Sequence, residues 1–181
     1  MLLIDDRIGS KDLAEPLERM GLSVDVTRLE YADVAFEGRG DDDKSVLVGV
    51  ELKKLPDLVD SLRSGRLAGH QLPGLLKSFD YRWLLIEGVW KPDKRGQLLV
   101  PGRHGDWHLS PAGMSVSELQ KRLLTLELRG GLHVWHSTSR FSTLHFLVAL
   151  YRWFTDQSMD HHTTHMVDHQ PHGFLEVSDF R

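Results

Sequence analysis

The 181-residue chain contains no cysteine. Disulfide bonds and thiolate metal sites are therefore excluded, and a reducing compartment is the natural expectation. The chain also lacks any run approaching the roughly 20 apolar residues that span a membrane. Its apolar start, residues 1–4, is followed at once by aspartates and has no basic segment before it, unlike a signal peptide. We therefore expect a cytoplasmic protein of a bacterium, or of a virus in its host, or one that is otherwise intracellular.

An excess of positive charge is missing as well. Lys and Arg total 22 against 26 Asp and Glu, which gives a formal net charge of −4. This balance argues against a protein that coats nucleic acid regardless of sequence, since such proteins are usually basic. It leaves room for an enzyme that acts on nucleic acid, because metal-binding acids lower the net charge while a local basic patch holds phosphates.

Hydrophobic periodicity predicts alternating strands and helices, with no internal repeat. Apolar or alternating runs predict strands at residues 2–5, 22–29, 31–38, 45–52, 81–88 and 131–136. Apolar residues three or four apart predict helices at residues 10–21, 55–62, 67–79, 115–131 and 142–154. Ser10 is the expected N-cap of the first helix. This order predicts an α/β fold with a mixed central sheet flanked by helices.

Two segments depart from this pattern. Residues 88–114 are rich in glycine, proline and charge, and predict a loop or an extra hairpin inserted into a domain that spans residues 1–156. Trp90 and Trp107 of this segment could stack on bases or pack in a minor core. Residues 157–181 are polar and rich in histidine, which predicts a flexible or docking tail.

The tail also contains His161 and His165, at the spacing of one helical turn. Such a pair could bind Zn²⁺ or Ni²⁺, but adventitious binding by a mobile tail is the favoured interpretation.

The predicted strands at residues 31–38 and 45–52 form a hairpin that brings charged residues together. If its loop centres on Asp41, Asp33 lies opposite Gly49, and Glu51 is a diagonal neighbour of Asp33 on the same face. Lys53 shares that face if the strand continues so far. One edge of the sheet would then present two carboxylates and a lysine close together.

This set of residues suits one particular chemistry. Carboxylates that converge on one point repel each other unless a cation lies between them, and hard oxygen ligands select Mg²⁺ or Mn²⁺. A neighbouring lysine can orient or deprotonate an attacking water, or stabilise charge on a phosphate. Metal-assisted phosphodiester hydrolysis requires such a set. The Glu-x-Lys spacing by itself is a weak signal, because any exposed strand end can carry it.

Further motifs surround this pair in a characteristic order. They are "IDDR" (4–7), "YAD" (31–33), "ELKKLPD" (51–57), "DSLRSGRL" (60–67) and "LLIEG" (84–88). Together they resemble the nuclease domain of the XPF/Hef family of structure-specific DNA endonucleases. That family is a branch of the restriction-endonuclease-like PD-(D/E)xK superfamily.

The resemblance implies a Mg²⁺-dependent endodeoxyribonuclease and a role for each matching residue. Asp33 and Glu51 would hold Mg²⁺ or Mn²⁺ together with the backbone carbonyl of Leu52. Lys53 would be the catalytic lysine, and Asp57 a further carboxylate that either supports the site or binds a second metal ion.

Outside this centre, the resemblance implies supporting roles. Asp5 and Arg7 would support the site or touch phosphate, although Asp5 could equally be an ordinary strand-end acid. Arg66 would contact the DNA backbone or hold the helix near Gly65. Branched, flap or fork DNA that is partly single-stranded is the implied substrate. The implied protein partner is a second copy or another protein, bound through the apolar C-terminal helix; no membrane association is expected.

The sequence also departs from the family pattern. Leu52 stands where the family has an arginine, Ala32 where it has a glycine, and Ile8 where it has a glutamate. Leu52 and the modest charge favour an alternative, a non-cleaving nuclease-fold module that binds DNA or a partner in a replication or recombination assembly. The intact Asp33, Glu51, Lys53 and Asp57 oppose that alternative.

Overall fold

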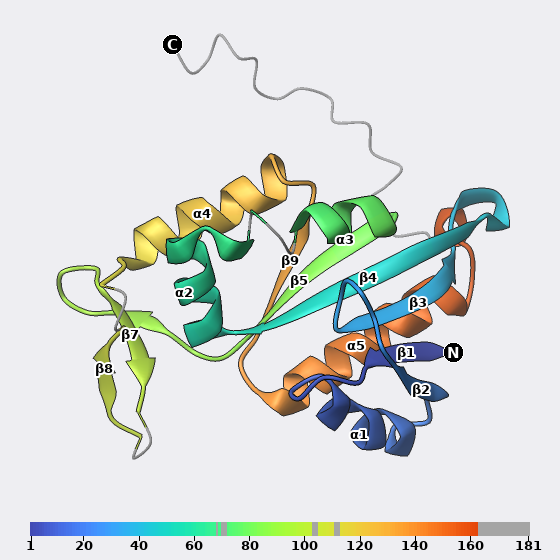
Figure 1. Cartoon of the computed structure of the whole chain (residues 1–181), viewed down its shortest axis with the longest axis horizontal. Helices are drawn as coiled ribbons and strands as arrows, with labels where there is room; N and C mark the ends of the chain where they lie inside the picture. The colour runs from blue at the N-terminus through green and yellow to red at the C-terminus, as the bar shows by residue number, and fades with distance from the viewer. Residues whose placement is uncertain (68, 70–71, 103–104, 111–112, 163–181) are drawn as a thin grey trace, which may run out of the picture.

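The structure is a computed structural model that describes residues 1–67, 69, 72–102, 105–110 and 113–162. Its centre is a six-stranded sheet in the order β2-β1-β3-β4-β5-β9 (Figure 1). The strands are β1 (Leu2–Asp5), β2 (Val24–Thr27), β3 (Val34–Arg39), β4 (Ser45–Lys54), β5 (Tyr81–Glu87) and β9 (His133–Ser137). The pairs β1–β3 and β3–β4 are antiparallel and the others are parallel. The prediction of a mixed sheet flanked by helices is confirmed.

Helices cover both faces of this sheet. One face packs against α1 (Ala14–Arg19) and α5 (Arg140–Thr155), around a core that includes Leu2, Ile4, Val34, Phe36, Val50 and Leu147. The other packs against α2 (Leu55–Ser64), α3 (Leu72–Ser78) and α4 (Val116–Leu128), around Leu58, Leu75, Leu84, Ile86 and Leu119. Because β4 alternates, Val48, Val50 and Leu52 lie on the α5 side, whereas Glu51 and Lys53 lie on the α2 side.

Residues 88–114 contain a second, three-stranded sheet. It consists of β6 (Lys91–Pro92), β7 (Leu98–Pro101) and β8 (Trp107–Leu109). The segment that the sequence predicts as a loop or an extra hairpin thus contains three strands. Figure 1 shows this small sheet projecting at the end of the molecule where β4 runs into α2.

The first helix begins later than the sequence predicts. A 3₁₀ turn, η1 (Lys11–Leu13), precedes α1, and the Ser10 side chain makes no capping hydrogen bond. Its hydroxyl donates instead to Asp33 Oδ1, at 2.5 Å. The expected capping bond is absent because Ser10 has helical backbone angles (φ −83°, ψ −46°), and its side chain is turned toward Asp33 instead of toward the N–H groups of the first turn.

The predicted hairpin register was also wrong, by two residues. β3 and β4 pair from Arg39↔Ser45 to Val34↔Val50, so Gly49 faces Ala35 and not Asp33. The turn is centred on Asp42, which lies in the short 3₁₀ segment η2 (Asp41–Asp43) and adopts a left-handed conformation. Asp33 therefore lies level with Glu51, nearer than the predicted diagonal.

The described chain continues past α5 into one further turn, η4 (Met159–His161). His165 and the remainder of the predicted tail lie outside the described residues. In the part of the chain that the structure describes, no helix has the length and apolar character needed to cross a bilayer.

Candidate active site

Three neighbouring strands bring the acidic residues to one place. Asp33 immediately precedes β3; its backbone N–H donates to Val50 O, and its carbonyl accepts from Asp5 N, each at 2.9 Å. The preceding residue, Ala32, has a φ of 78°, which is a left-handed conformation that a glycine adopts at a lower cost in free energy. Asp5 at the end of β1, Asp33 just before β3 and Glu51 in β4 thus lie side by side.

The carboxylate of Asp33 is held from both sides. Oδ2 accepts from the backbone N–H of Leu52 at 2.7 Å, and Oδ1 accepts from the hydroxyl of Ser10. Two donors fix both the position and the orientation of this side chain. A fixed carboxylate suits metal binding, because the free energy of ordering it is already part of folding.

Glu51 and Lys53 form a buried ion pair. Lys53 Nζ lies 3.0 Å from Glu51 Oε1, and the side chains of Lys53 and Glu51 are only 9% and 11% exposed, respectively. Burial raises the pKa of Glu51, the charge of Asp33 raises it further, and Lys53 opposes both effects. Two acids beside each other, of which Glu51 is buried and Asp33 half-buried, repel each other, and a bound cation would relieve that repulsion.

The oxygen atoms at this place are of the chemical type that binds a hard divalent cation. Two carboxylates and the Leu52 carbonyl are oxygen ligands, and Mg²⁺ is commonly held by one or two carboxylates with water completing the shell. Among the residues that the structure describes, no three histidine, aspartate or glutamate side chains already form a closed metal cage.

Asp57 approaches Asp33 from another direction. It lies exposed in the first turn of α2, after Pro56. Asp33 and Asp57 both line a cavity of about 300 Å³, together with Leu52, Lys54 and Arg140. The four predicted residues thus divide into two sets that share Asp33: Asp57 faces the cavity, and Glu51 and Lys53 are buried beside Asp33.

Asp5 and Arg7 lie behind the site. The side chain of Asp5 is fully buried and accepts from Leu29 N at 3.0 Å and from Arg7 Nε. Burial tends to raise the pKa of Asp5, but the hydrogen bonds from Arg7 and Leu29 outweigh it and hold this pKa below its usual value. The charge of Arg7 also acts on Asp33 and Glu51. This geometry favours a supporting role.

Arg66 holds the end of α2. The helix ends at Gly65, which has a φ of 73°. Arg66 Nη2 then donates to Ser61 Oγ at 3.1 Å, while Ser61 donates to Asp57 O at 2.6 Å. Of the two roles considered from the sequence, these contacts favour the structural one, and they tie Arg66 indirectly to the backbone of Asp57.

The sequence analysis missed Arg140, the first residue of α5. Its Nε lies 3.5 Å from Glu87 Oε2, the same oxygen that accepts from Thr143 Oγ1 at 2.8 Å. Its Nη1 is buried without a hydrogen-bond partner among the described residues, and the side chain lines the cavity with Asp33 and Asp57. The one sequence signal was Glu87 at the end of "LLIEG", an acid that needed a partner.

The fold and these residues define a nuclease-type α/β domain, with acids and a lysine at the edge of a mixed sheet. The chain belongs to the ERCC4 domain family, whose model matches residues 4–150. No curated protein sequence matches it.

Two solved structures share the fold. XPF from Aeropyrum pernix in complex with DNA aligns with a TM-score of 0.59 and 21% identity, covering 83% of this chain and 62% of that one. Another structure of XPF from Aeropyrum pernix gives a TM-score of 0.56 and 21% identity, with 83% and 63% covered. This chain thus spans less than two thirds of the proteins that it resembles.

Proposed function

We propose that the protein is a DNA endonuclease that hydrolyses phosphodiester bonds with the help of Mg²⁺ or Mn²⁺. The observation that carries the proposal is the fixed carboxylate of Asp33 beside the buried Glu51–Lys53 pair. Burying charge costs free energy that an ordinary strand end avoids by staying in water. Such a cost is commonly retained where the charges perform a reaction.

Each residue has a role in this proposal. Asp33 and Glu51, with the Leu52 carbonyl, would hold the cation. When bound, the cation supplies a Lewis acid that draws charge from the phosphate and makes water a better nucleophile. Lys53 would orient the attacking water or stabilise the phosphate charge. The water oxygen bonds to phosphorus, and the ester oxygen leaves and takes up a proton.

The cavity wall would hold the phosphate backbone. Lys54 and Arg140 bring positive charge to a cavity that also contains Asp33 and Asp57. The Nη1 of Arg140, which has no partner among the described residues, is a donor that a phosphate oxygen could satisfy. Asp57 would support the site or bind a second cation from across the cavity.

The proposed substrate is branched, flap or fork DNA with a single-stranded part. DNA as the partner is supported by the related Aeropyrum pernix structure, which is a complex with DNA. The branched form rests on the family resemblance, as do roles in DNA repair or recombination.

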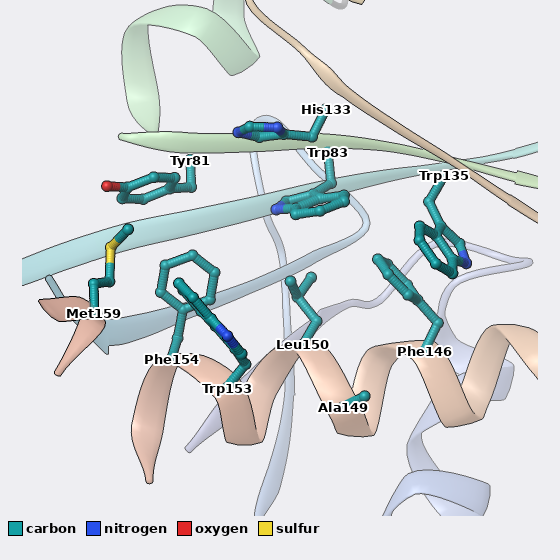
Figure 2. Close-up of a pocket in the computed structure, with 10 residues that line it drawn as sticks. All are labelled: Tyr81, Trp83, His133, Trp135, Phe146, Ala149, Leu150, Trp153, Phe154 and Met159. Atoms are coloured by element: carbon teal, nitrogen blue, oxygen red, sulfur yellow. The ribbon is translucent and has the colours of Figure 1, made fainter. Parts of the chain in front are cut away.

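We also propose that two copies of the chain pair through α5 and β9. A cavity of about 460 Å³ lies between these elements and β5, and its lining is almost entirely apolar. Figure 2 shows Tyr81, Trp83 and His133 on one side of this cavity and Phe154, Leu150 and Phe146 on the other. Trp135 and Trp153 are 46% and 38% exposed at its margin, and β9 is an edge strand. An exposed apolar patch beside an open edge suits a self-complementary interface.

A cleavage assay tests the enzymatic proposal. Wild type and Asp33→Asn would be compared on flap, fork and blunt duplex DNA with Mg²⁺, and binding to the same DNAs measured in parallel. Asparagine keeps an acceptor for Leu52 N but removes the negative charge. We expect the wild type to cut and the variant to bind without cutting. If wild type binds but cuts none of the substrates, or if the variant cuts equally well, the enzymatic proposal fails. In the first case the non-cleaving module replaces it.

A further inference from the structure

The small sheet of β6, β7 and β8 has one buried and one open face. Leu98 and Val100 of β7 point into the core, where they are 0% and 7% exposed. Side chains alternate along a strand and directly paired residues share a face, so Leu99, Pro101 and their partners on the neighbouring strands point outward. The pairings Lys91↔Leu99↔Leu109 and Pro101↔Trp107 place these residues in two rows on the open face.

This outward face combines an aromatic ring with positive charge. Trp107 is 39% exposed and Leu109 is 56% exposed. Lys91 Nζ lies 4.2 Å from the centroid of the Trp107 ring. Lys94 and Arg95 are exposed in the turn that follows β6, where the nearby Asp93 uses Oδ1 to accept from the backbone N–H groups of Arg95 and Gln97.

The base of the small sheet is fixed next to the candidate active site. Gly88, directly after β5, donates to Ser137 O at 2.9 Å, and its carbonyl is hydrogen-bonded to His136 Nε2. The ring of Trp90 lies 3.8 Å from that of His136, centroid to centroid. The preceding residue, Glu87, pairs with Arg140 in the wall of the cavity. The small sheet therefore extends from the strand ends that frame the site (Figure 1).

We infer that the outward face of β6–β8 binds the single-stranded arm of the DNA substrate. Trp107 would stack on an unpaired base, and Lys91, Lys94 and Arg95 would contact phosphates. Aromatic faces bind unpaired bases without sequence preference, whereas duplex bases already stack on each other. This inference rests on the proposed function and extends it, since it names the element that would distinguish branched from blunt DNA.

The test measures binding of the full chain in an Asp33→Asn background, which leaves the DNA intact. The probes are a fluorescent flap DNA with a single-stranded arm and a blunt duplex with the same paired sequence. We expect Trp107→Ala to weaken flap binding by about tenfold, Trp107→Phe to retain most of it, and neither to change duplex binding. Replacing Lys91, Lys94 and Arg95 by alanine should lower the slope of log affinity against log salt by about 0.7 for each phosphate that is no longer bound.

Two controls make the outcome decisive. Lys121→Ala removes an exposed cation from α4 and should leave flap binding unchanged. Thermal unfolding of each variant shows whether it is folded. Unchanged flap binding by the Trp107→Ala variant, or an equal loss for duplex, would overturn the inference and point to a protein partner on this face. If wild type binds neither DNA, the proposed function itself fails.

Discussion

One half of the central sheet buries charged side chains, whereas the other half exposes apolar ones. At β1, β3 and β4, charged groups lie inside and each has a partner: Asp5 has Arg7, Asp33 has Ser10 and Leu52 N, and Glu51 has Lys53. At β9 and α5, tryptophans remain at the surface around an apolar cavity.

Both arrangements cost free energy in an isolated chain, and the costs differ in kind. A buried charge loses its hydration, and this free energy is recovered only through polar or charged partners, such as another side chain, a bound ion or a phosphate. Exposed apolar surface is recovered by covering it with another apolar surface. The comparison therefore separates the region proposed for chemistry from the region proposed for assembly, and each proposal can be tested without the other.

The largest effect is expected at Lys53. Replacing it by methionine keeps the length and the apolar stem but removes the ammonium that lies 3.0 Å from Glu51. Cleavage should fall by about 10²–10⁴-fold, the range usual for loss of an acid–base group. Rates of flap cleavage under single-turnover conditions measure this, and sedimentation should give the same oligomeric state as wild type. A variant that cuts at the wild-type rate would remove Lys53 from the reaction.

A smaller effect is expected at Arg140. Arg140→Ala should lower cleavage by roughly 10–100-fold, because it removes a charge-assisted hydrogen bond to phosphate. The matched control is Arg152→Ala, an exposed arginine further along the same helix. Separate measurement of kcat and KM shows whether Arg140 acts on binding or on the reaction. Equal behaviour of the two variants would mean that Arg140 only pairs with Glu87.

The apolar half is tested at Trp153. Trp153→Lys places a positive charge in the proposed interface, and a cation near the C-terminal end of α5 is favourable for the helix itself. We expect self-association to weaken by about 30-fold, as for a hot-spot residue. Val26→Lys is the control, since Val26 is also 38% exposed but lies on β2 at the opposite edge. Analytical ultracentrifugation over a range of concentrations measures the change. Wild type that stays monomeric throughout would exclude this interface.

The smallest effect concerns Arg7 and has a defined pH dependence. Arg7→Gln leaves the buried Asp5 with weaker partners and should destabilise the fold by about 1–3 kcal/mol at neutral pH. Since the pKa of Asp5 is lowered in the folded protein, the unfolded chain binds more protons below about pH 4. The contribution of the pair is thus complete at neutral pH and is lost as the pH falls through the lowered pKa. Urea unfolding of both proteins from pH 7 to pH 3 should show their difference shrinking. A constant difference would contradict this account.

Sequence patterns predicted the strands and most helices because alternation and helical spacing are local properties. They also placed Asp33, Glu51 and Lys53 on one face, since a two-residue error in register leaves the face unchanged. The same error hid that Asp33 is level with Glu51, because the left-handed residues of the 40–44 turn have no strong sequence signal. The contacts of Ser10 and Arg140 could not be predicted, as both depend on segments far apart in the chain meeting at the sheet edge.

Leu52 contributes to the site through its main chain. Its N–H holds Asp33, and its carbonyl is the proposed third ligand, while its side chain lies half-buried against the α5-side core. Every amino acid except proline supplies the same N–H and carbonyl. The side chain at position 52 can therefore change while both backbone groups of the site are kept. The main requirement at this position is then a side chain whose volume fits against the neighbouring core. An apolar residue within the charged "ELKK" run is therefore compatible with the proposed reaction centre.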